Sequence, residues 1–273
     1  MKKPFAVWWY LALVFGLSWP WQLWYVFRAE SAFEKYAFSS LAMVMVGVGT
    51  FIAGRFVFKD GFAGAGWRWG KPGQYVAVVA FACFIWLVPS VIEVISGIHK
   101  PVGEIVATTL LTSFALRFIA TLLPAFGEEF GWRGYLLPRL VGQHGARKGL
   151  LLHAFIWWFW HLPAIIGLGL KTADLSSTPF LNVVLLLVIT LIPAMLHAVI
   201  FAYIWAKTDS LVVASVYHAA FDEVRDTLES GVGFGPLVEL WQMAVIILVG
   251  GYLLWKTDWG KLLHESSNGL STR

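Results

Sequence analysis

Two adjacent carboxylates and an arginine lie in a strongly apolar stretch of the chain: Glu128, Glu129 and Arg133. A charged side chain at the centre of a membrane helix costs at least roughly 2.5 to 3.5 kcal/mol, so such groups usually mark a functional site. Residues four apart face each other on a helix, which predicts an ion pair between Glu129 and Arg133. Glu128 is rotated by about 100° from Glu129, which leaves it a free carboxylate and a candidate general base. The alternative is an ion-pair cluster at the membrane interface.

Two further segments carry histidine in apolar surroundings. His161 follows four aromatic residues, of which Trp157 is the first. His218 and Asp222 are four residues apart and share one helix face, where they could ligate a metal, orient a water or stabilise an oxyanion. The alternative for this pair is a hydrogen bond between helices. If the three segments converge, they form a water-activating centre inside the bilayer, made of Glu128, His161, His218 and Asp222.

Two more histidines, His153 and His197, also lie in apolar segments. His197 has no carboxylate at helical spacing, so we expect it to serve in packing or gating, and no role follows for His153. Motifs of other hydrolases are missing from the sequence, since it contains neither His-Glu-x-x-His nor Gly-x-Ser-x-Gly. A hydrolase that uses carboxylate and histidine is the chemistry that remains.

The composition places these residues in a membrane. The chain has 273 residues, of which 59% are hydrophobic and 13% charged, against about 45–50% and 25% in soluble proteins. Its mean hydropathy is +0.72, and apolar runs of about 20 residues recur. This predicts an all-α, polytopic integral membrane protein with a single membrane domain, residues 1–273. One cysteine, Cys83, excludes an internal disulfide and a thiolate metal cluster.

The apolar runs predict about eight transmembrane helices. Their approximate bounds are 5–27, 38–58, 74–95, 104–126, 149–168, 180–206, 211–228 and 236–255. Pro124 and Pro163 interrupt two of these runs close to Glu128 and His161, and we expect each proline to bend its helix. The remaining segment, about 257–273, predicts a disordered polar tail.

The loop charges predict the orientation. With the N-terminus in the cytoplasm, the cytoplasmic loops hold most of the basic residues: Lys2, Lys3, Arg55, Lys59, Arg68, Lys71, Arg139, Arg147, Lys148, Lys207, Lys256, Lys261 and Arg273. The opposite loops hold Arg28, Lys35, Lys100 and Lys171. This bias places both termini in the cytoplasm. Because the basic residues are accounted for by topology, the net charge of +4 does not indicate nucleic-acid binding.

The three motifs, in this order on successive spans, resemble those of the CPBP family, the CAAX protease and bacteriocin-processing proteins, also called type II CAAX prenyl endopeptidases. The matching positions are Glu128, Glu129 and Arg133, then Trp157 and His161, then His218 and Asp222. The resemblance covers a catalytic core of about residues 122–222. Trp157 stands where the family usually has Phe, and we expect a tolerated packing change. Asp222 stands where CAAX-cleaving members tend to have Asn.

The resemblance implies an intramembrane endopeptidase. Glu128 and His161 would activate water, His218 and Asp222 would stabilise the oxyanion, and Glu129 and Arg133 would support the first motif. It leaves two mechanisms open: a Zn²⁺-dependent metalloendopeptidase with Glu128, His161 and His218 as ligands, or a metal-free glutamate mechanism. The implied substrate is a peptide or protein with a membrane-associated, prenylated segment, or a bacteriocin leader. The implied location is a prokaryotic plasma membrane.

Two other classes of function remain open. A non-catalytic immunity or scaffold protein could bind a peptide in the same cavity without cleaving it. A proton-coupled transporter could use the same intramembrane histidines and carboxylates as relays, although no inverted repeat with paired broken segments is visible in the sequence.

Overall fold

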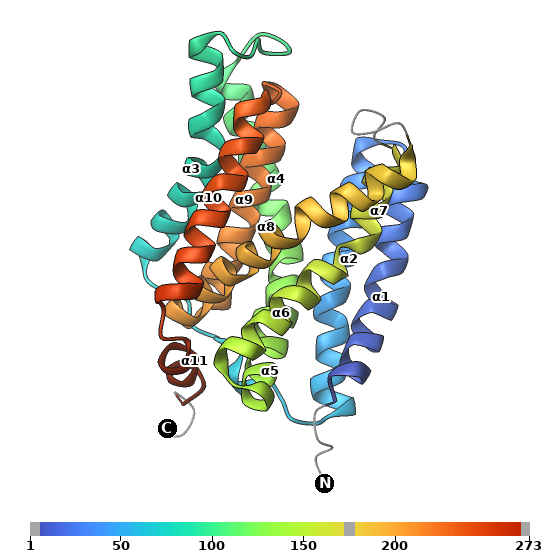
Figure 1. The fold of residues 1–273 in the computed structure, drawn as a ribbon, viewed down its shortest axis with the longest axis vertical. Helices are drawn as coiled ribbons and strands as arrows, with labels where there is room; N and C mark the ends of the chain where they lie inside the picture. Colours follow the sequence, from blue (N-terminus) through green and yellow to red (C-terminus); the bar gives the residue numbers. More distant parts are fainter. Residues whose placement is uncertain (1–5, 172–177, 269–273) are drawn as a thin grey trace.

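Figure 1 shows the computed structural model of the protein, which describes residues 6–171 and 178–268. The elements follow in this order: α1 (Val7–Phe27), α2 (Ala32–Ile52), η1 (Ala53–Val57), η2 (Ala63–Ala65), α3 (Pro72–Ser96), α4 (Ala107–Glu129), η3 (Phe130–Leu136), α5 (Leu137–His144), α6 (Ala146–Trp160), α7 (Leu162–Lys171), α8 (Pro179–Thr208), α9 (Leu211–Gly231), α10 (Pro236–Lys256) and α11 (Trp259–Asn268). No β-strand occurs in the described residues. The predicted all-α class is confirmed.

Several helices can cross a membrane. Five continuous segments are long and apolar enough: Ala32–Val57, Pro72–Ser96, Ala107–His144, Pro179–Thr208 and Pro236–Lys256. A sixth results if the bent pair α6 and α7 is counted as one span. The other two predicted spans are α1, whose apolar run contains Pro20 and Gln22, and α9, which carries the His218–Asp222 motif. The chain is an integral multi-pass membrane protein, and the count of eight crossings stays a prediction.

The predicted disordered tail is wrong for residues 259–268, which form α11. Trp259 and Leu263 are four residues apart and both are buried. The Trp259 indole N–H donates to the Leu253 carbonyl at 3.2 Å, and α11 packs against α6 and α8. Figure 1 shows α11 at the same end of the bundle as the start of α1. Packing of Trp259 and Leu263 against the bundle anchors this polar segment; residues 269–273 lie outside the described residues.

Two glycines bring α2 and α4 together beside Glu128. A Cβ added to Gly47 would lie 2.9 Å from the Gly127 Cα, and one added to Gly127 would lie 3.1 Å from the Val44 Cα. Any side chain larger than hydrogen would therefore push the two helices apart. This close approach fixes the position of α4 one residue before Glu128.

The path from α6 to α7 breaks at His161. The two helices meet at an angle of 45°, and Pro163 lies in the first turn of α7, where its missing N–H needs no partner. The bend predicted at Pro163 is therefore present. Pro124, in contrast, lies inside the continuous helix α4. The break places His161 at a helix end rather than in a regular helical span.

A carboxylate from α3 caps the start of α10. Glu93 is buried and accepts the backbone N–H groups of Gly235, Leu237 and Val238 at 2.9, 2.5 and 3.3 Å. The first N–H groups of a helix have no partner within the helix, and a carboxylate there also interacts favourably with the helix dipole. Glu93 thereby ties α10 to α3.

Replacing Glu93 with alanine should lower the free energy of unfolding by about 1–3 kcal/mol, because buried N–H groups would lose their acceptor. Thermal unfolding in detergent measures this change. The matched control is Glu239→Ala, an exposed residue in the first turn of the same helix, which should be nearly neutral. Equal stability of Glu93→Ala and wild type would contradict the capping role.

Candidate active site

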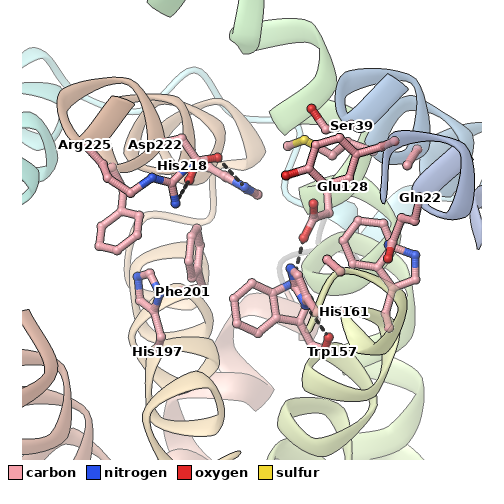
Figure 2. A pocket seen from close by; sticks show the side chains of 16 residues that line it. Gln22, Ser39, Glu128, Trp157, His161, His197, Phe201, His218, Asp222 and Arg225 are labelled. Atoms are coloured by element: carbon pink, nitrogen blue, oxygen red, sulfur yellow. Dashed lines mark hydrogen bonds and ion pairs between the residues drawn. The ribbon is translucent and has the colours of Figure 1, made fainter. Parts of the chain in front are cut away.

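The four predicted catalytic residues line one pocket of about 270 Å³. Glu128 comes from the end of α4, His161 from the break after α6, and His218 and Asp222 from α9. Figure 2 shows His218 and Asp222 together on the side of the pocket away from Trp157 and Gln22. The lining of the pocket also includes Gln22, Tyr25, Ser39, Trp157, Trp160, His197, Phe201 and Arg225. The three segments therefore converge, while the catalytic roles of their residues stay predictions.

A π-helix, η3, follows Glu129 directly. Single π-helical turns within α-helices occur frequently at functional sites. Gly131 allows η3 to pack closely, because an added Cβ would lie 2.5 Å from a Val46 methyl group on α2. The Tyr10 hydroxyl of α1 donates to the Gly131 carbonyl at 2.9 Å. These contacts hold η3 against α1 and α2.

Glu129 is the centre of a fully buried charge cluster. Its Oε1 accepts hydrogen bonds from Arg133 Nη1 at 2.9 Å and from His218 Nδ1 at 2.8 Å. Glu129 and Arg133 are both 0% exposed. The predicted ion pair between them is confirmed. The contact with His218 was not predicted, and it connects the first motif to the third.

Aromatic rings cover the guanidinium group of Arg133. Its Cζ lies 4.2 Å from the centre of the Phe201 ring and 4.8 Å from that of Trp157. Two of its nitrogens, Nε and Nη2, have no hydrogen-bond partner among the described residues. Cation–π attraction is worth up to about 2 kcal/mol at a desolvated site and partly compensates for these missing bonds.

Glu128 is held by the residue where this chain departs from the family motif. The Trp157 indole N–H donates to Glu128 Oε1 at 2.6 Å, and Figure 2 shows this contact. Phenylalanine has no such donor. Trp157 therefore adds a hydrogen bond that the expected packing change does not include. The other carboxylate oxygen of Glu128, which has no hydrogen bond in the described structure, is available to the pocket.

His161 presents one ring nitrogen to the pocket. Its Nδ1 lies 2.8 Å from the carbonyl oxygen of Trp157, and a carbonyl can only accept. Nδ1 therefore carries the proton, which assigns Nε2 as the acceptor of the neutral ring. The ring stacks edge-on against Trp157 and Trp160, with centroid distances of 4.7 and 4.8 Å.

His218 lies between two carboxylates. Its Nδ1 contacts Glu129, and its Nε2 lies 3.4 Å from Asp222 Oδ2. Asp222 also contacts Arg225 at 3.4 Å, and Arg225 contacts Asp226 at 2.7 Å. In this arrangement Asp222 lies at ion-pair distance from both His218 and Arg225.

A zinc site on Glu128, His161 and His218 would need three donors that converge at about 2.0–2.2 Å from one point. Among the described residues, no three His, Cys, Asp or Glu side chains are grouped so that they could hold a metal ion. His161 keeps Nε2 free, but both nitrogens of His218 face carboxylates, so His218 has no free ring nitrogen for a metal. The donor set does not fit this metal, so the chemistry below is derived from the side chains alone.

The structure separates the two histidines to which the sequence assigns no catalytic part. His197 lines the pocket and its Nε2 lies 2.9 Å from the Tyr217 hydroxyl, whereas His153 is fully buried elsewhere. Gln22 of α1 also lines the pocket and is absent from the sequence prediction. The sequence signal that could have indicated Gln22 is a carboxamide within the apolar run of residues 7–27.

A family model described as Type II CAAX prenyl endopeptidase Rce1-like matches residues 110–224. The matched segment runs from α4 into α9 and contains every predicted site residue. It confirms the resemblance stated from the motifs. No curated protein matches the chain.

Arg133→Met should lower the free energy of unfolding by about 3–5 kcal/mol, because it leaves the buried Glu129 carboxylate uncompensated. Adding Glu129→Gln should recover part of this loss, since a neutral amide oxygen can still accept from His218. Thermal unfolding of the single and double variants in detergent compares them. A double variant that is less stable than Arg133→Met would contradict the charge-cluster account.

Proposed function

Because residues 110–224 belong to the Rce1-like family of type II CAAX prenyl endopeptidases, we propose that this protein is an intramembrane endopeptidase. Its substrate would carry a prenylated cysteine close to its C-terminus. The observation that carries the proposal is the single pocket on which Glu128, His161 and His218 converge. A bacteriocin leader is the other substrate class, and no observation favours it.

Glu128 and His161 are the proposed water-activating pair. A water between the free Glu128 oxygen and His161 Nε2 can donate one hydrogen bond to each. Glu128 then takes a proton as the water oxygen attacks the carbonyl carbon of the peptide bond. The Trp157 N–H keeps the carboxylate aimed during this step. Glu128 returns the proton to the leaving nitrogen as the C–N bond breaks, which yields a carboxylic acid and an amine; the acid then passes its proton to the amine, giving a carboxylate and an ammonium group.

His218 is the proposed donor to the oxyanion. The His218 ring is held by its Nδ1, which lies 2.8 Å from Glu129 Oε1, and Asp222 Oδ2 lies 3.4 Å from its Nε2. An Nε2–H held in this way can donate a hydrogen bond to the negative oxygen of the tetrahedral intermediate. Donors that are fixed before the reaction give the largest electrostatic benefit in a site shielded from water.

A second cavity gives the substrate room beyond the catalytic pocket. It measures about 660 Å³ and shares Tyr25, Ser39, Met43, Asp222 and Arg225 with the first. Its wall includes the exposed apolar side chains of Phe33 and Leu116, which suit a lipidated segment. Cavities of roughly 300–1,000 Å³ are typical of ligand sites, so a peptide can extend from one cavity into the other.

Glu128→Gln and His161→Ala should each reduce cleavage of a prenylated peptide by at least about 100-fold, because general acid–base catalysis contributes roughly 10²–10⁴. Both proteins should remain folded in detergent, as seen by thermal unfolding. Full activity in both variants would reject the proposed mechanism. The alternative is an immunity or scaffold protein. It predicts that neither the wild type nor the variants cleave the peptide, and that all of them keep the same activity in the cell.

Trp157→Phe should lower kcat roughly tenfold while KM changes little, because the ring remains but Glu128 loses the hydrogen bond that aims it. The matched control is Trp160→Phe. It removes the same N–H from a ring whose partner is the Ser18 hydroxyl at 2.8 Å, and its effect on kcat should be smaller. Equal effects of the two variants would show that Trp157 acts through packing.

A further inference from the structure

Helix α1 presents one face to the interior of the protein. Its buried residues at spacing of four are Tyr10, Val14, Ser18, Gln22 and Val26. The Tyr10 hydroxyl contacts Thr50 of α2 and the Gly131 carbonyl of η3, each at 2.9 Å. The Ser18 hydroxyl accepts the Trp160 indole N–H at 2.8 Å. These bonds fix the rotation of α1, so Gln22 must face the interior as well.

Gln22 differs from the other polar residues of this face. The residue is 5% exposed, and its buried Oε1 has no hydrogen-bond partner. It is the one carboxamide among the described residues that line the catalytic pocket. In the orientation that the structure describes, the amide oxygen is the buried and unpaired atom.

An unpaired buried amide calls for an explanation. Burying a polar group without a hydrogen bond costs stability, and proteins pair such groups with few exceptions. An apolar side chain of similar size would avoid this cost. Gln22 lies on the wall of a pocket, so a change of its side-chain rotamer can bring the amide to a molecule in the pocket, which then supplies the missing partner.

We infer that Gln22 is a substrate-binding residue that hydrogen-bonds a peptide group next to the scissile bond; this rests on the proposed endopeptidase function. A peptide group offers one acceptor and one donor, and a carboxamide offers the matching donor and acceptor. The carboxylates of Glu128 and Asp222 can only accept. Gln22 is the carboxamide of this pocket, and its oxygen and nitrogen can pair with both atoms of one peptide group.

The position of Gln22 supports this assignment. Figure 2 shows it on the α1 wall of the pocket, on the opposite side from the His218–Asp222 pair. A peptide bond attacked by water from Glu128 would therefore have Gln22 within the same small volume of about 270 Å³. Gln22 lies outside the matched residues 110–224, so α1 would supply a substrate contact to the catalytic core.

Gln22→Met keeps the length and shape of the side chain and removes both hydrogen bonds that the amide would make to the substrate. We expect kcat/KM for a prenylated peptide to fall roughly tenfold to hundredfold, mainly through KM, as two neutral hydrogen bonds are lost. Thermal stability should stay equal or rise, because an unpaired buried amide is removed. Ser18→Ala, on the same face, loses a satisfied bond and should be less stable than wild type. A destabilised Gln22→Met protein with unchanged KM would assign Gln22 a structural role and overturn the inference.

A change on the substrate side identifies the bond. The probe is a peptide with farnesyl-cysteine followed by three aliphatic residues, in which one backbone amide at a time is replaced by an ester. The ester lacks the N–H donor. We expect a loss of roughly tenfold in kcat/KM at one position with wild type and no further loss there with Gln22→Met, as in a double-mutant cycle. Independent losses at every position would overturn the inference.

Binding of the unmodified peptide to the Glu128→Gln protein separates this inference from the proposed function. If wild type cleaves the peptide and Gln22→Met cleaves it equally well, the inference fails and the proposed function stands. If wild type does not cleave it, yet Gln22→Met weakens its binding to the Glu128→Gln protein at least tenfold, the proposed function fails and Gln22 remains a peptide-binding residue. If the wild type does not cleave the peptide and the Glu128→Gln protein does not bind it, both the proposed function and the inference are overturned.

Discussion

One carboxylate oxygen, Glu129 Oε1, holds the catalytic region together. It accepts from Arg133 and from His218, so it joins the end of α4, the π-helix η3 and α9. Apolar contacts between membrane helices are weakly directional, because lipid is as apolar as the side chains. A buried charge cluster has one geometry in which its members compensate one another, and loss of one member leaves the others unpaired. The register of α9 against α4 therefore depends on this polar contact.

The proposed base, Glu128, is left free for chemistry because Glu129 makes the structural contacts. Successive helical residues point about 100° apart, so the two glutamates meet different surroundings. Glu129 faces the charge cluster, whereas Glu128 faces the pocket. Trp157 connects the two regions, since its N–H binds Glu128 while its ring lies over the Arg133 guanidinium. Displacement of Trp157 would disturb the aim of the base and the shielding of the cation together.

Helical spacing was enough to predict the contacts within one element. The Glu129–Arg133 pair and the shared face of His218 and Asp222 follow from residues four positions apart. The bend between α6 and α7 follows from a single proline, Pro163. Contacts between elements could not be predicted in the same way. The Trp157–Glu128 bond spans 29 positions, and the unpaired state of Gln22 depends on how α1 is rotated by Tyr10 and Ser18. The helix α11 was missed because its order comes from packing on α6 and α8.

The irregular parts of the helices coincide with the chemistry. Hydrolysis needs water at a depth where lipid excludes it, and backbone groups freed by an irregular helix also need partners there. The π-helix begins one residue after Glu129, and the break between α6 and α7 falls at His161. His161 lines the pocket in which a substrate water would lie, whereas η3 carries Arg133, the partner of Glu129. The break thus ends α6 at a residue that faces the pocket, and the π-helix follows directly after the two glutamates. The departures from helical geometry therefore flank the two groups that the proposed mechanism uses.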